Sequence, residues 1–507
     1  MSASAYPRFD DQTASTDDKI LLASLGYKQE LRREFTTLEL FGFGFSVTAI
    51  VPSIASVLFY SLPNGGASAM VWGWATSSVF IMFIAMAMAE LGSAAPTSGG
   101  LYYWTFKYSS PRYRNILSGV GWSCATAIMA AASIGSDGKF TPTVHQTYAV
   151  YIAILLAFAF ISSAATWVLA RFQRVIIALN LALVLVMVIG LPSATPAEFK
   201  NSASYAFGNF ENITLWPSGY AFILSFLAPL WSISGFDSGV HISEEARNAN
   251  VAVPWAIIYA TGSGTILGFA VQVALAFCMG IDTDDILSSP VQQPMATILL
   301  NSFGKRGMLA VWSFIFLSLF LGGVGLLISS SRQIFAFSRD GALIFSRFLY
   351  KINSVTGTPV RSVWFSVICA ALLGLTSFAG PAATGAIFSL GVVGQYVANS
   401  IPIAARYLGG QEFTRGPFHL GIFSMPIAIA AVLWMWFMTV VLLFPSAPDP
   451  TAQTMNNTVV VLFGVLFLAL VYYYFPRFGG VHWFQGPVAT IEDEVDMTKE
   501  KSEDGLA

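Results

Sequence analysis

The stretch LWSISGFDSGVH, residues 230–241, interrupts an apolar run that begins near residue 220. Small polar residues and two glycines replace aliphatic side chains here, and Asp237 adds a carboxylate at membrane depth. Backbone N–H and C=O groups cannot face lipid without partners, so a helix broken at this point must line a cavity inside the protein. An ionisable group within a membrane span is a functional-site hypothesis by default. We therefore predict a transporter-like membrane protein with a discontinuous helix at its binding site.

The composition of the whole chain favours a polytopic membrane protein. Of its 507 residues, 55% are hydrophobic and 10% are charged, and the mean hydropathy is +0.66. Soluble domains carry about 25% charged residues. The net charge of −2 gives no reason to expect a nucleic-acid partner. Cys124, Cys278 and Cys369 all lie in apolar stretches, so we interpret them as packing residues and not as disulfides or metal ligands.

Twelve stretches are long and apolar enough to cross a bilayer, which takes about 20 residues each. They are residues 38–60, 69–91, 116–135, 149–169, 175–193, 220–241, 255–279, 309–330, 362–380, 384–404, 421–444 and 457–475. An even number puts the polar tails, residues 1–37 and 476–507, on one side of the membrane.

The basic residues predict that this side is the cytosol. With both tails inside, the outer loops hold only Lys139, Lys200, Lys305 and Arg306 of the 25 lysines and arginines in the chain. This is a strong positive-inside bias. The two Asn-x-Thr sequons, at residues 212–214 and 456–458, also fall in loops assigned to the outside.

A second interruption is predicted in the first span, where residues 42–53 read GFGFSVTAIVPS. Pro52 removes a helical hydrogen bond, although a kinked packing helix is an equally good interpretation of this segment alone. Breaks in the first and sixth spans are typical of two five-helix repeats, inverted in the membrane around a shared site. We therefore predict an all-α fold of twelve transmembrane helices. Residues 38–193 and 220–404 form the repeats, and residues 421–475 form two further helices.

Asp237 is the sharpest candidate for chemistry. It either pairs with a cationic substrate group, carries a coupling proton, or accepts N–H bonds exposed by the break. His241 shares its face if the helix resumes, which permits a proton relay, and a buried polar packing role is the alternative. Phe236 is either a lid over the substrate or part of the core.

Glu244 and Glu245 lie at the predicted cytosolic end of the sixth span. Together with Arg247 and Arg332 they are candidates for ion pairs that hold an inner gate closed. The alternative is that these charged side chains are simply solvated by water. Metal-ligand clusters, nucleophile elbows and phosphate loops are absent from the sequence, so we predict no enzyme activity, no cofactor and no metal.

Three motifs identify a family resemblance. Residues 90–104 (ELGSAAPTSGGLYYW), 235–249 (GFDSGVHISEEARNA) and 332–342 (RQIFAFSRDGA) resemble segments of the amino acid–polyamine–organocation permeases. Together they look most like the fungal branch that contains GABA and choline permeases. The resemblance covers about residues 35–480 and implies the five-plus-five, LeuT-like fold. By position, it implies substrate contacts at Ser46, Thr48, Ala49, Ile50, Ser234, Gly235, Phe236 and Asp237.

The resemblance also implies a secondary active transporter, usually proton-coupled, for GABA, a related amino acid or a small amine. A choline or polyamine permease and a non-transporting nutrient sensor are the alternatives. The plasma membrane is the expected location, with the vacuolar membrane as the second choice. One departure concerns the third span, residues 116–135: the chain after Trp104 is several helical turns shorter than its relatives, which puts this helix's share of the site in doubt.

Overall fold

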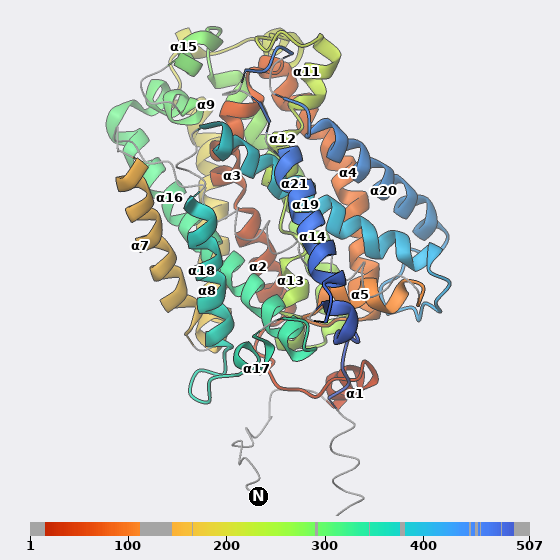
Figure 1. The fold of residues 1–507 in the computed structure, drawn as a ribbon. Helices are drawn as coiled ribbons and strands as arrows, with labels where there is room; N and C mark the ends of the chain where they lie inside the picture. The colour runs from red at the N-terminus through yellow and green to blue at the C-terminus, as the bar shows by residue number, and fades with distance from the viewer. Residues whose placement is uncertain are drawn as a thin grey trace, which may run out of the picture.

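The computed structural model describes residues 16–111, 144–164, 166–288, 293–343, 345–375, 381–445, 448–451, 455–456, 458–477 and 479–490, and the regular elements within these ranges are all helical (Figure 1). The first half contains α1 (Thr16–Ser24), α2 (Thr37–Thr48), α3 (Ile50–Ser61), α4 (Gly66–Ala94), α5 (Gly100–Tyr108), α7 (Val144–Ser162), α8 (Thr166–Leu185), the π-helical turn η1 (Val186–Gly190), α9 (Leu191–Ala194), η2 (Ala197–Phe199) and α10 (Ala203–Gly208). The second half contains α11 (Ser218–Leu224), α12 (Leu227–Ser232), α13 (Ser238–His241), η3 (Ser243–Glu245), α14 (Ala249–Cys278), α15 (Thr283–Ser288), α16 (Pro294–Arg339), α17 (Ser346–Leu349), α18 (Val360–Gly374), α19 (Pro381–Leu408), η5 (Gly421–Phe423), α20 (Ser424–Val441), α21 (Thr458–Tyr474) and η6 (Gly480–His482).

The predicted spans overlap these helices, except for residues 116–135. Those residues, together with residues 165, 376–380 and 457 of other predicted spans, lie outside the described residues. Six helical segments of the described part of the chain are long and apolar enough to cross a membrane. They are Thr37–Phe59, Gly66–Ala94, Val168–Ala194, Ala249–Cys278, Pro294–Arg339 and Gly421–Val441. Shorter apolar helices include Tyr148–Ser162, Ser218–Ser232, Val360–Leu372 and Thr458–Tyr474. An all-helical polytopic membrane protein is thus confirmed, and the count of twelve crossings and the inverted repeat stay predictions.

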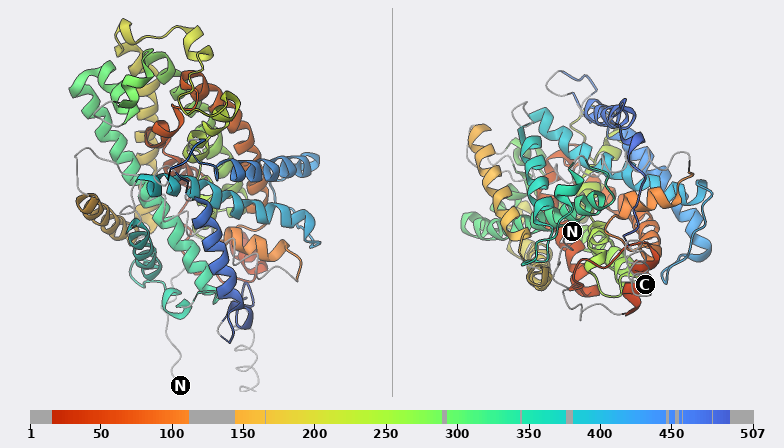
Figure 2. Two further views of the ribbon diagram at one scale, coloured as in Figure 1. Left: turned by 45° about the horizontal axis from the view of Figure 1, so that its top comes forward. Right: turned by 60° about the horizontal axis from the view of Figure 1, so that its bottom comes forward.

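The outer surface of the bundle is apolar where a soluble protein would be polar. Phe160 on α7, Leu433 on α20 and Val460 on α21 are 68%, 66% and 72% exposed. Exposed hydrophobic side chains on several helices match a surface solvated by lipid. The two ends of the bundle differ: α15 lies at one end, and α1 with the C-terminal end of the described chain lies at the other (Figures 1 and 2). We call this second end the terminal face.

The helices from the two predicted breaks pack in the middle of the bundle. α12 packs against α3 and α19, and α13 packs against α2 and α16. α14 runs alongside α4 and also packs on α2. The segments that carry residues 49 and 233–237 are therefore surrounded by other helices, and their irregular backbone is kept from lipid as the bilayer requires.

Candidate functional site

The first predicted helix break is present at Ala49. This residue has φ 38° and ψ 63°, a left-handed conformation that separates α2 from α3. A non-glycine residue in this region carries backbone strain, which persists only where the surrounding packing holds it. Ser53 contributes to holding it, since its N–H donates to the Ala49 carbonyl at 2.8 Å and its hydroxyl donates to the Thr48 carbonyl at 2.7 Å. The first N–H groups of an α-helix have no partners inside the helix, and in α3 these belong to Ile50 and Val51, because Pro52 has no N–H.

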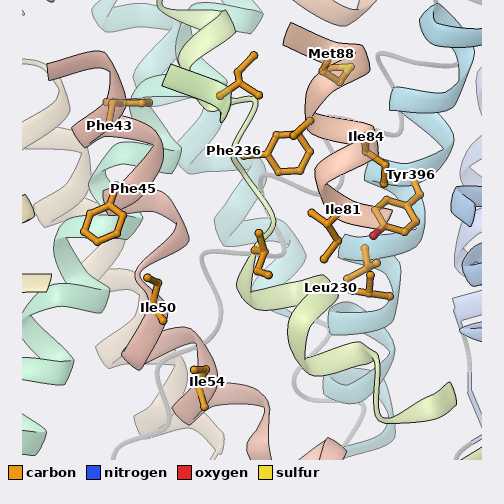
Figure 3. Close-up of a cluster of buried hydrophobic side chains, with 14 of the residues drawn as sticks. Phe43, Phe45, Ile50, Ile54, Ile81, Ile84, Met88, Leu230, Phe236 and Tyr396 are labelled. Carbon is orange, nitrogen blue, oxygen red and sulfur yellow. The ribbon is translucent and has the colours of Figure 1, made fainter. Parts of the chain in front are cut away.

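The second break covers residues 233–237, between α12 and α13. Gly235 has φ +77°, and a Cβ atom there would lie 2.5 Å from Val47 Cγ1. Glycine is therefore needed for the backbone conformation and for the close approach of the two breaks. Figure 3 shows Phe236 on this unwound connection, with Ile50 on the facing α2–α3 pair.

A cavity lies beside the two breaks. Its wall includes Ala49, Ser234, Gly235, Asp237 and His241 from the broken helices. The polar residues Ser329 and Gln333 from α16 and Gln395 from α19 also line it. Phe158, Trp231, Phe316 and Phe320 supply aromatic surface, with the rings of Phe158 and Phe320 in edge contact at 4.9 Å between centroids. No lysine or arginine is among the described residues that line the cavity.

The eight predicted substrate contacts divide into two groups. Ala49, Ser234, Gly235 and Asp237 line the cavity. Ser46, Thr48, Ile50 and Phe236 are not part of its wall. The Ser46 hydroxyl donates to the Phe43 carbonyl at 2.8 Å, and the Thr48 hydroxyl donates to the Gly44 carbonyl at 2.9 Å.

Ile50 and Phe236 belong to the apolar core instead. They are 1% and 3% exposed, and the Phe236 ring points toward Ile81 and Ile84 of α4 (Figure 3). In this structure Phe236 therefore lies in the apolar core and not over the cavity.

Asp237 is 8% exposed, and its carboxylate accepts a hydrogen bond of 3.1 Å from the side-chain amide of Gln395. The helix does resume after the break, as α13, and His241 also lines the cavity. The His241 Nδ1 atom lies 3.2 Å from the Ser98 carbonyl oxygen in the α4–α5 loop. The two proton-coupling candidates therefore share one cavity, and His241 also touches the loop toward the terminal face.

Sequence reasoning missed Gln395 and Gln333. Gln395 lies inside the predicted span 384–404, so a search for polar residues within the spans would have found it, whereas Gln333 lies just beyond the predicted span 309–330. The Nε2 atom of Gln333 is buried and has no hydrogen-bond partner. A donor of this kind beside a cavity is available to a ligand or to water.

Two ion pairs join η3, which follows α13, to α16. Arg332 donates to Glu245 at 2.7 Å, with both side chains fully buried, and Arg339 donates to Glu244 at 2.9 Å. Arg339 was not among the candidates chosen from the sequence. Arg247 donates from Nε to the backbone carbonyl of Arg33 at 3.0 Å.

Glu244 also holds the α4–α5 loop. Its Oε1 atom accepts from the Thr97 hydroxyl at 3.1 Å and from the Ser98 N–H at 3.0 Å. Burial alone would raise the pKa of Glu244, but the Arg339 guanidinium and these donors hold that pKa below its usual value. Glu244 is therefore ionised at neutral pH and joins α16, the segment after α13 and the α4–α5 loop.

This arrangement defines a class of protein. Two interrupted helices line a sparsely charged cavity in an apolar helical bundle, and buried ion pairs lie in the segment that follows the second of these helices, an arrangement typical of membrane transporters.

Comparisons with known proteins give the family. A family model described as "Amino acid permease" matches residues 35–466. An uncharacterised amino-acid permease of Schizosaccharomyces pombe is 37% identical and covers 94% of this chain and 90% of its own length. The GABA-specific permease of Saccharomyces cerevisiae is 34% identical, with 96% and 88% covered. Amino-acid permease 2 of Neurospora crassa is 32% identical, with 96% and 92% covered. The chain belongs to the amino acid permease family of integral membrane transporters, and is not an enzyme.

Proposed function

We propose that the protein is a secondary active transporter, a proton-coupled symporter, for GABA or a related amino acid. The amino group of the substrate pairs with Asp237, and the carboxylate is held by backbone N–H groups at the start of α3. A helix N-terminus favours an anion at this position. The cavity supports this assignment because it contains one carboxylate and no lysine or arginine among the described residues that line it.

The coupling proton is assigned to Asp237 and His241. Both are buried, and both line the cavity. In the proposed orientation, both termini are cytosolic and the ion pairs of Glu244 and Glu245 form the inner gate. The fold is the twelve-helix, five-plus-five arrangement predicted from the sequence, and the plasma membrane is the location favoured over the vacuolar membrane.

A choline or polyamine permease is the second candidate, and one observation favours it. The aromatic side chains of Phe158, Trp231, Phe316 and Phe320 beside Asp237 suit a quaternary or primary ammonium group, which binds to aromatic faces. A nutrient sensor of the same fold is the third, because binding without transport would use the same cavity.

Uptake of labelled GABA, choline and putrescine separates these candidates. The full-length chain is expressed in cells that lack their own permeases, and initial rates are measured at two external pH values. Saturable GABA uptake that is faster at the lower pH supports the proposal. Uptake of choline or putrescine alone supports the second candidate, and binding without accumulation supports the sensor.

A further inference from the structure

The N-terminal segment, residues 25–35, packs directly on the ion-pair cluster at the terminal face. The Phe35 N–H donates to the Glu245 carbonyl at 3.0 Å, and the Gln29 side chain donates to the Glu244 carbonyl at 2.9 Å. Tyr27 is 1% exposed, and its ring lies 3.8 Å from the guanidinium carbon of Arg339. Opening the gate therefore requires this segment to move.

The C-terminal segment, residues 479–490, lies across the N-terminal segment. Phe484 is anchored beside Phe337 of α16, with 6.0 Å between ring centroids, and the Val488 N–H donates to the Asp340 carboxylate at 3.1 Å. Asp340 also accepts from the Tyr27 hydroxyl at 3.1 Å. One carboxylate thus joins both segments to the end of α16.

Thr490 makes the direct connection between the two segments. Its N–H donates to the Gly26 carbonyl at 2.8 Å, and its hydroxyl oxygen accepts from the Lys28 N–H at 2.9 Å. These two bonds lie on either side of Tyr27, the residue that stacks on Arg339. The hydroxyl of Thr490 is therefore a chemically modifiable group at the point where the C-terminal segment holds the N-terminal one.

The sequence after Thr490 reads IEDEVD, with acidic side chains two, three and four residues beyond the hydroxyl, at Glu492, Asp493 and Glu494. Acidic residues at these positions form the charge pattern by which acid-directed protein kinases select their substrates. Thr490 is itself only partly buried.

We propose that Thr490 is a phosphorylation site for an acid-directed kinase, and that its modification releases the N-terminal segment from the C-terminal one and loosens the inner gate. The γ-phosphoryl group of ATP forms a bond to Thr490 Oγ1 as its bond to the leaving ADP oxygen breaks. The hydroxyl proton passes to the kinase. The phosphoryl group is far larger than the hydroxyl whose oxygen now accepts from the Lys28 N–H at 2.9 Å, so the present fit of the two segments is lost.

The first test is the modification itself. Full-length protein is incubated with ATP and an acid-directed kinase, and the tail peptide is analysed by mass spectrometry. Phosphate on Thr490, with a slower reaction in Asp493→Asn, is the expected result. Phosphate on Thr498 or Ser502 with Thr490 unmodified would overturn the proposal.

The second test is amide hydrogen exchange of residues 25–35 and 243–249 in the full-length chain. Thr490→Glu is expected to speed exchange there about tenfold, the effect of losing one to two net hydrogen bonds. Thr490→Val keeps the backbone bond to Gly26 and should give a smaller increase. Thr498→Glu adds the same charge elsewhere in the tail and should match the wild type.

Equal exchange in Thr490→Glu and the wild type would contradict the proposal. The inner-gate role rests on the proposed function, but neither measurement involves a substrate. A failure of this proposal is therefore distinguishable from a failure of the transport assignment.

Discussion

At the scale of single residues, the bond between Gln395 and Asp237 is the contact most specific to this cavity. Gln395→Leu removes a neutral donor from a carboxylate that is expected to bind the substrate. We expect the KM for uptake to change about tenfold, the usual scale for a hydrogen bond to a charged group. Gln272→Leu is the matched control, because Gln272 is 1% exposed on α14 and is not part of the cavity wall. Equal KM values for both variants would remove Gln395 from the site.

We expect Asp340 to make the stability of the terminal face depend on pH. Burial raises the pKa of its carboxyl well above its usual value, although the Val488 N–H and the Tyr27 hydroxyl oppose the shift. A raised pKa in the folded protein means that the folded form binds the proton more tightly than the unfolded form. The protonated carboxyl therefore contributes its full stabilisation below the unfolded-state pKa, and this contribution is lost as the pH rises through the folded-state pKa. Arg339 is the adjacent charged side chain and stacks on Tyr27.

Amide exchange of residues 480–490, corrected for the intrinsic pH dependence of exchange, should therefore speed up as pH rises. Asp340→Asn, a neutral side chain of the same shape, should flatten this dependence. If the corrected exchange rate of Asp340→Asn still increased with pH, another group would be responsible for the pH dependence.

At the scale of elements, the break between α12 and α13 depends on Gly235. Gly235→Ala places a Cβ atom 2.5 Å from Val47 Cγ1, at a residue with φ +77°. We expect a loss of about 1–3 kcal/mol of stability from backbone strain, together with reduced uptake. Gly239→Ala, four residues later, is the control, since its Cβ would meet Leu40 at an ordinary 3.6 Å. The Tm of each variant is measured by thermal unfolding in detergent. An equal decrease in Tm for Gly235→Ala and Gly239→Ala would contradict this account.

The elements also show what the sequence could predict. The apolar helices among the described residues and both helix breaks were predictable, because a bilayer demands long apolar helices and tolerates irregular backbone only around a cavity. The part of the cavity wall that α16 and α19 supply was not predictable. Gln333 and Gln395 line the same cavity as Asp237 only because distant parts of the chain pack together. The pairing of Glu244 with Arg339 depends on the same packing, since 95 residues separate the two in sequence.

At the scale of the whole molecule, the parts form one continuous path of contacts. The cavity contains Asp237 and His241, His241 touches the α4–α5 loop, and Glu244 ties that loop to Arg339. Tyr27 then connects Arg339 to the two terminal segments. A substrate in the cavity and a modification at Thr490 would therefore act on the same cluster from opposite sides.

The central claim is that the cavity beside the two helix breaks carries an amino acid across the membrane by means of Asp237. The most direct test is the uptake of labelled GABA, or of the best substrate in the panel, by proteoliposomes containing the full-length chain under an imposed pH gradient. The account predicts accumulation by the wild type, and a fall of about tenfold or more for Asp237→Asn at equal protein content, as a charge-assisted contact is lost. Equal accumulation by Asp237→Asn and the wild type would contradict it.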